Sequence, residues 1–199
     1  MDMVQIAQIA LALAAGIGLS ASCGFRVFLP PLIVSLASMA GFVSLGEDFA
    51  WMGTWQAAVA FGVAAVVEIA AYYIPALDNF LDTISVPLST IAGLGITAAL
   101  LGSDVSPALR WILAVIAGGG TAIATSTATA GIRAVSTTTT AGLGNGLFST
   151  LEAGTSTILS VIAIALPILG LVLAVIVFVL VRKLIRKLRN RKKATPAEA

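Results

Sequence analysis

Long apolar stretches, separated by short polar or glycine-rich breaks, fill most of this chain and limit what it can fold into. They cover residues 6–19, 27–45, 56–74, 87–101, 107–117 and 148–181. A helix needs roughly 20 apolar residues to cross the hydrocarbon core of a bilayer. Only 10% of the 199 residues are charged, whereas a soluble globular domain carries about 25%. We therefore expect an all-α, polytopic membrane helix bundle, and the composition excludes a water-soluble domain.

The charges are distributed unevenly along the chain. Eight of the eleven Lys and Arg residues lie between Arg182 and Lys193, while the first 181 residues contain three basic and eight acidic residues. We expect a single transmembrane domain over residues 1–181 and a basic tail over 182–199. Basic segments beside a membrane span remain in the cytoplasm, so the tail is expected there. The tail accounts for the basic pI and indicates contact with lipid, and nucleic acid is not expected as a partner.

The missing residue types exclude several kinds of chemistry. The chain has no His, and Cys23 is its single cysteine. An intrachain disulfide and a Cys/His zinc site are therefore excluded, as is a mechanism that needs a histidine base. We expect no enzymatic activity, no metal and no cofactor.

Two segments 107 residues apart share one pattern. Residues 20–26 (Ser-Ala-Ser-Cys-Gly-Phe-Arg) and 127–133 (Thr-Ala-Thr-Ala-Gly-Ile-Arg) both follow a glycine-containing apolar stretch, and a helix with a lone glutamate comes later in each half. This predicts two repeats, about 4–102 and 107–181, that contain interrupted or re-entrant helices. The repeats are parallel if residues 87–101 cross the membrane and inverted if they do not. The shortness of that stretch favours inverted repeats.

The two arginines that end this pattern, Arg26 and Arg133, are the strongest candidates for a binding site. A charged side chain near the middle of a bilayer costs about 2.5–3.5 kcal/mol, so two at matched positions need a reason. A guanidinium group beside the N-terminus of a broken helix is suited to a phosphate or carboxylate. The predicted substrate-binding residues are Arg26, Arg133, Ser20, Ser22, Thr127, Thr129, Glu68 and Glu152. The alternative is that each arginine pairs with a glutamate and only stabilises the bundle.

The acidic and hydroxyl residues each have two interpretations. Glu68 lies inside an apolar stretch and is either a proton- or cation-binding acid or an ion-pair partner of an arginine. Residues 121–140 contain eight Thr and two Ser, which either pack helices closely or line a polar path. Asp78 and Asp82 have the spacing of a weak cation pair, but a solvated helix start is the better interpretation.

Three blocks of the sequence are distinctive. They are Gly24–Pro30 (Gly-Phe-Arg-Val-Phe-Leu-Pro), Glu68–Asp82, and Gly131–Glu152, which opens with Gly-Ile-Arg. With the chain around them, over most of residues 5–165, they resemble a family of small bacterial membrane proteins known as domain of unknown function 4126. The resemblance implies an integral protein of the bacterial cytoplasmic membrane. It implies no activity, so the function must be argued from the side chains.

The leading hypothesis is a small membrane transporter or lipid-handling protein that binds an anionic, phosphate-like group between the two repeats. One alternative is a proton or metal-ion channel or exchanger that uses Glu68 and threonine oxygens. Another is a structural membrane subunit that transports nothing. The expected partners are membrane lipid and either a small anion or a phosphorylated lipid head group. The sequence leaves open whether the chain forms a homo-oligomer.

Overall fold

A computed structural model describes residues 2–103, 105–140 and 145–194, and every regular element in these ranges is helical. For residues 75, 76, 78, 79, 135–140, 145, 181, 184, 185 and 187–194, only the backbone is described. The elements are α1 (Met3–Cys23), α2 (Leu29–Met39), η1 (Glu47–Gly53), α3 (Trp55–Ala71), α4 (Pro75–Leu101), α5 (Pro107–Leu113), η2 (Ala114–Gly119), α6 (Gly120–Thr140), α7 (Asn145–Ala165) and α8 (Pro167–Ala194). The expected all-α bundle is confirmed.

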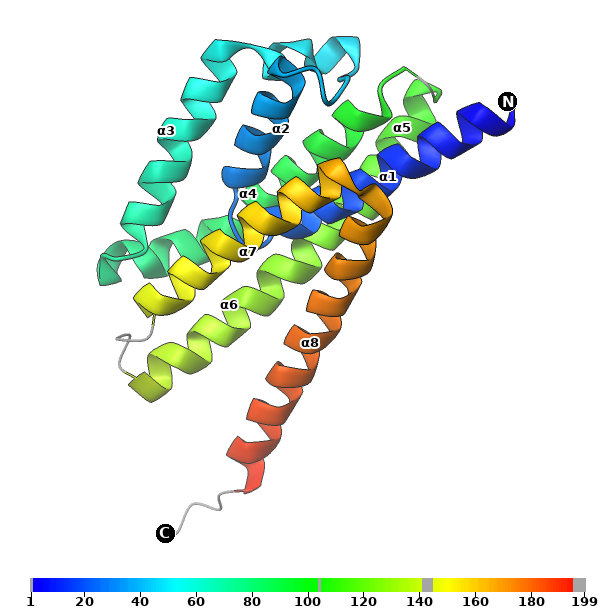
Figure 1. Ribbon diagram of the computed structural model, residues 1–199. Coiled ribbons are helices and arrows are strands. Elements are labelled where there is room, and N and C mark those ends of the chain that lie inside the picture. The colour runs from blue at the N-terminus through cyan, green and yellow to red at the C-terminus, as the bar shows by residue number, and fades with distance from the viewer. Residues whose placement is uncertain (1, 104, 141–144, 195–199) are drawn as a thin grey trace.

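Several helices are long and apolar enough to cross a membrane. Among the described residues there are four, or five if the pair η1 and α3, bent by 65°, is one span. Figure 1 shows the N-terminus and the C-terminus at opposite ends of the bundle. The fold is thus a polytopic membrane helix bundle, as the hydropathy predicted.

The first of the two predicted interruptions is present. Helix α1 ends at Cys23, and the chain turns through residues 24–28 before α2 begins at Leu29. This turn is enclosed by protein, since Arg26 is 0% and Val27 6% exposed. Irregular backbone at membrane depth is tolerated where protein covers it, which explains why the turn is buried.

The second predicted interruption is absent, and Arg133 lies within a continuous helix. The chain is helical from Pro107 to Thr140, with a π-helical turn over Ala114–Gly119. The glycines of this turn provide room for a neighbouring helix instead of ending the element. A Cβ atom on Gly118 would lie 2.6 Å from the carbonyl oxygen of Gly93 in α4.

Pro167 and Pro87 have different effects on the helices around them. The stretch 148–181 is divided at Pro167, because α7 ends at Ala165 and α8 begins at Pro167. Helix α4, in contrast, begins at Pro75 and continues through Pro87, so its candidate span is Phe80–Leu101, with 22 residues. In lipid, a continuing helix keeps the remaining backbone groups hydrogen-bonded, which favours carrying on past a proline.

Small residues bring α1, α4 and α6 close together. A Cβ atom on Gly93 of α4 would lie 2.9 Å from the Cβ of Ala122 and 3.1 Å from that of Ser20. Gly16 of α1 and Gly118 of η2 both pack against Thr97 of α4. Close approach through small side chains is a principal source of helix association in membranes.

These contacts also give the directions of the helices. Gly16 and then Ser20 meet Thr97 and then Gly93, so α1 runs antiparallel to α4. The chain from Gly118 to Ala122 is antiparallel to α4 in the same way. Helices α1 and α6 therefore run in the same direction, as Figure 1 also shows, which gives no support to an inverted repeat. The duplication itself stays a prediction from the sequence.

Candidate functional site

The candidate site lies toward one end of the bundle. This end contains the turn between α3 and α4, the end of α6 and the start of α7. The turn between α3 and α4 touches the start of α7, because the Tyr73 hydroxyl is hydrogen-bonded to the Thr150 hydroxyl at 2.8 Å. Arg133 lies seven residues before the last residue of α6, and Glu152 lies seven residues after the first residue of α7. Each distance is about 10 Å at 1.5 Å per residue. Each of these two residues also lies only three positions from the midpoint of its own helix, on the side of the junction.

Arg26 reaches this region from the turn after α1. Its side chain is fully buried, and Nη2 donates to both the backbone oxygen of Ser149 (2.8 Å) and the Ser149 hydroxyl (2.6 Å). The same nitrogen lies 3.5 Å from Oε2 of Glu152. Arg26 thus joins the turn between α1 and α2 to the first turns of α7.

Arg133 reaches the same carboxylate from α6. Its Nε donates to Oε1 of Glu152 at 3.1 Å, and its Nη2 donates to Oε2, so the fork of the guanidinium holds both oxygens. Its Nη1 also lies 3.7 Å from Oδ1 of Asp82 on α4. Two-point pairing of this kind is the strongest arrangement of arginine with a carboxylate.

Tyr72, just after α3, contacts both guanidinium groups. The Cζ atom of Arg26 lies 4.1 Å from the centroid of the ring, and that of Arg133 lies 3.9 Å from it. The residue is 5% exposed. A desolvated cation over an aromatic ring is stabilised by about 2 kcal/mol, so Tyr72 is part of the charged cluster rather than an interface anchor.

Glu68 has a different role from Glu152. Its two oxygens accept hydrogen bonds from the backbone N–H groups of Val27 (2.8 Å) and Phe28 (3.1 Å), at the start of α2. The partial positive charge of a helix N-terminus favours an anion there. The Glu68 carboxylate therefore occupies the position beside a helix N-terminus that was predicted from the sequence to bind an anionic ligand.

The cluster has no excess of positive charge. Two guanidinium groups, Arg26 and Arg133, stand against three carboxylates, Glu68, Glu152 and Asp82, which gives a formal charge of −1 when all are ionised. This balance explains how the arginines are accommodated inside an apolar bundle, since buried charges need partners.

The predicted hydroxyls do not bind the charged groups: Ser20 and Thr129 bond to carbonyls of other segments, and Ser22 bonds within its own helix. Ser20 donates to Gly93 O (2.9 Å), Ser22 to Gly18 O (2.9 Å), and Thr129 to Gly24 O (3.1 Å). Thr127 is exposed and lies on the face of α6 that turns toward α8. The structure thus brings together Arg26, Arg133, Glu68 and Glu152, whereas the four hydroxyls bind carbonyls or lie elsewhere.

Three members of the cluster were not predicted as site residues: Tyr72, Asp82 and Ser149. Tyr72 lies four residues after Glu68, and Ser149 three residues before Glu152, so helical spacing places each on the face of a predicted residue. Asp82 was interpreted as solvated, but its side chain is 26% exposed and faces Arg133. The side chain of Asp78 lies outside the described residues.

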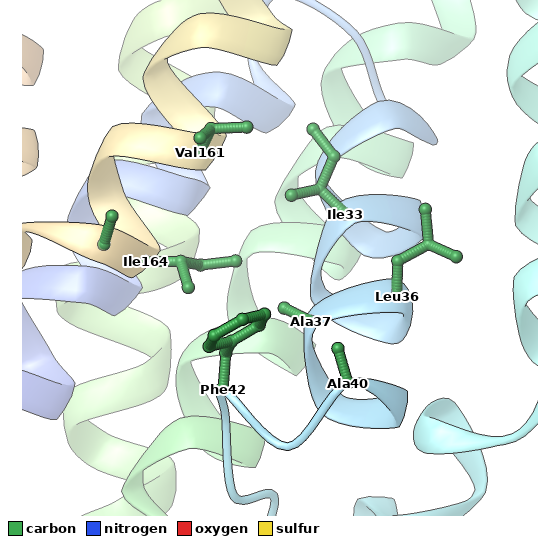
Figure 2. A pocket seen from close by; sticks show the side chains of 8 residues that line it. Ile33, Leu36, Ala37, Ala40, Phe42, Val161 and Ile164 are labelled. Carbon is green, nitrogen blue, oxygen red and sulfur yellow. The ribbon is translucent and has the colours of Figure 1, made fainter.

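One apolar hollow lies away from the cluster. A groove of about 660 Å³ between α2 and α7 is lined by aliphatic residues and Phe42 (Figure 2). Figure 2 shows Ile33 and Leu36 of α2 on one side and Val161 and Ile164 of α7 on the other. None of the predicted site residues lines this groove.

The comparisons with known proteins agree with the sequence resemblance. The chain matches no curated protein and no solved structure. The sequence model of one family, described as a domain of unknown function (DUF4126), matches residues 13–187. This range contains all the charged groups of the cluster, and the chain therefore belongs to the DUF4126 family.

Proposed function

We propose that this protein is a small membrane transporter or lipid-handling protein in which Arg26 and Arg133 bind an anionic, phosphate-like group. One observation carries the proposal: two buried guanidinium groups converge on the single carboxylate of Glu152. A carboxylate that is held by the fork of Arg133 and lies 3.5 Å from Nη2 of Arg26 occupies the position that two oxygens of a phosphate would take. Glu152 is thus an internal substitute for the ligand.

The net negative charge of the cluster is the basis for a proposed coupling between anion binding and proton uptake. The cluster is already at −1, so an anion can replace Glu152 at low cost only when a carboxylate is neutralised. Protonation of Glu152 would release both arginines toward the ligand. We therefore propose that binding of the anion and uptake of a proton occur together, at the end of the bundle from which the basic tail emerges.

The orientation is part of the same proposal. The groove between α6 and α8 brings Arg182 near Gly131, two residues before Arg133, so the tail leaves from the end that holds the cluster. Because basic segments remain in the cytoplasm, we propose that this end faces the cytoplasm in a cytoplasmic membrane. The ligand would then enter or leave the site from the cytoplasmic side.

Flux measurements on reconstituted vesicles test the proposal. Inorganic phosphate and a fluorescent phosphatidylglycerol are the two probes, because they distinguish a soluble anion from a lipid head group. Arg26→Gln and Arg133→Gln should each lower the flux of the active probe about tenfold or more, since each removes charge-assisted hydrogen bonds. Arg110→Gln, at the opposite end of the bundle, is the matched control and should retain the flux.

A binding measurement tests the site independently of the flux assay. Glu152→Gln removes the internal competitor, so phosphate should raise the unfolding temperature of this variant more than that of the wild type. No phosphate effect on either protein, together with no flux of either probe, would contradict the proposal and favour a structural subunit.

The formal charge of −1 favours a second candidate, a cation or proton pathway through Glu68. That function predicts flux that follows the cation gradient and is abolished in Glu68→Gln, with Arg26→Gln retaining activity if it folds. The same vesicles therefore distinguish the two functions.

A further inference from the structure

A second site lies on the outside of the bundle, between α6 and α8. The two helices diverge toward their C-terminal ends (Figure 1), and they enclose a hollow of about 650 Å³. Its walls include Ile123, Thr127 and Gly131 of α6 and Phe178, Arg182 and Arg186 of α8. Ligand pockets generally have about 300–1,000 Å³, so the hollow has the size of a binding site.

The wall that α6 contributes consists mostly of residues with small side chains. Ala124, Ala128 and Gly131 follow one another at helical spacing and have at most a methyl group as side chain. Phe178 of α8 lines the same hollow. A mainly apolar trough beside an aromatic side chain is suited to a flexible hydrocarbon chain, which gains contact along its length.

One end of the trough is basic. Arg182 and Arg186 are one helical turn apart, are exposed, and line the hollow just beyond the apolar part of α8. Arginine stems can lie along apolar surface while their guanidinium groups stay at the level of the lipid head groups. Two forks at that level are suited to a phosphodiester, and all described side chains of the hollow are neutral or basic.

We propose that an anionic glycerophospholipid binds in this groove, with an acyl chain between α6 and α8 and its phosphate between Arg182 and Arg186. The combination of an apolar trough and a basic mouth selects a lipid over a soluble anion, which would use only the mouth. The site is separate from the cluster of Arg26 and Arg133 and does not depend on its function. It gives Thr127, which the cluster does not use, a place in the wall of the groove.

Lipid retention by the purified full-length chain tests the site. Native mass spectrometry in detergent would compare bound phosphatidylglycerol with bound phosphatidylcholine, each added at the same concentration. The wild type should retain phosphatidylglycerol preferentially. Arg182→Gln and Arg186→Gln should each lower that preference about fivefold, the effect expected for one basic residue near an anionic lipid.

Two controls distinguish the groove from general attraction to the tail. Lys183→Gln removes the same charge from an exposed residue that lines an adjoining hollow of α8 but not the groove against α6, so the preference should change less than in the two arginine variants. Thr127→Trp fills the trough without a change of charge and should lower retention of both lipids, whereas Thr157→Trp, on the exposed face of α7, should not.

The variants give results that either support the lipid site or overturn it. Loss of preference in the two arginine variants, with a smaller change in Lys183→Gln and Thr157→Trp unaffected, supports the site. An equal loss in all three basic variants, or full retention in Thr127→Trp, would overturn it and leave only unspecific attraction between the tail and the membrane.

Discussion

Arg26 and Arg133, 107 positions apart in the chain, hold the same carboxylate and contact the same aromatic ring. Arg26 lies in the turn after α1, and Arg133 lies inside α6. Glu152 and Tyr72 bring α7 and the end of α3 to this pair. With Asp82 of α4, which lies 3.7 Å from Arg133, five segments of the bundle meet at two guanidinium groups, and the first predictions concern this meeting point.

Glu152 should be the most sensitive acidic position in the protein. Glu152→Gln leaves two buried guanidinium groups without their common counter-charge, and removing one partner of a buried ion pair costs about 3–5 kcal/mol. Thermal unfolding in detergent should show a large decrease in stability. Glu47→Gln, at an exposed acid of η1, is the control and should unfold like the wild type. Equal stability of the two variants would contradict the pairing.

Tyr72 should matter for its ring and not for its hydroxyl. Tyr72→Leu removes the aromatic face from both guanidinium groups and should lower the free energy of unfolding by about 2 kcal/mol or more. Tyr72→Phe keeps the ring and should be close to the wild type in the same unfolding measurement. If the Phe variant is as unstable as the Leu variant, the ring contacts are not the source of stability.

Gly24 should tolerate no side chain, because α6 approaches the chain closely at this residue. A Cβ atom there would lie 2.7 Å from the backbone nitrogen of Ser126, so Gly24→Ala should cost about 1–3 kcal/mol by overpacking. Gly154→Ala is the matched control on α7, where an added Cβ meets no atom within 4 Å. That variant should be neutral or up to about 1 kcal/mol more stable, since alanine favours a helix. A destabilised Gly154→Ala beside a neutral Gly24→Ala would reverse this interpretation.

The ion pair at the other end of the bundle should contribute little to stability. Arg110 and Asp48 lie 2.6 Å apart, but the Asp48 side chain is 66% exposed. Exposed pairs contribute about 0–1 kcal/mol, so Asp48→Asn should change stability far less than Glu152→Gln does. Unfolding at low and high salt checks the comparison, and the small effect should shrink further as salt screens the pair. An effect of Asp48→Asn as large as that of Glu152→Gln would show that exposure does not govern these pairs.

Thiol labelling should report both burial and orientation. Cys23 is 1% exposed, so a membrane-impermeant maleimide should not label the folded wild type from either side. New cysteines at Asp2 and Lys183 should be labelled from opposite sides, since the two termini lie at opposite ends of the bundle (Figure 1). Lys183→Cys should react from the cytoplasmic side. Labelling of both from one side would refute the proposed orientation.

Much of the architecture follows from local sequence properties. Long apolar stretches with few charges determined an all-helical membrane bundle, because lipid offers no partner for an exposed backbone group. Pro167 determined the boundary between α7 and α8. The high cost of a lone charge in lipid also made it predictable that Arg26 and Arg133 would have acidic partners.

Only the tertiary structure decided which partners these are. Glu152 serves both arginines, Glu68 caps the start of α2, and Tyr72 lies against both guanidinium groups. The chain also remains helical at Gly118. This glycine has no side chain, and α4 packs closely against it at Gly93. Periodicity in a sequence reports one helix at a time, whereas these pairings depend on the positions at which separate helices cross, and those positions are set by packing across the whole bundle.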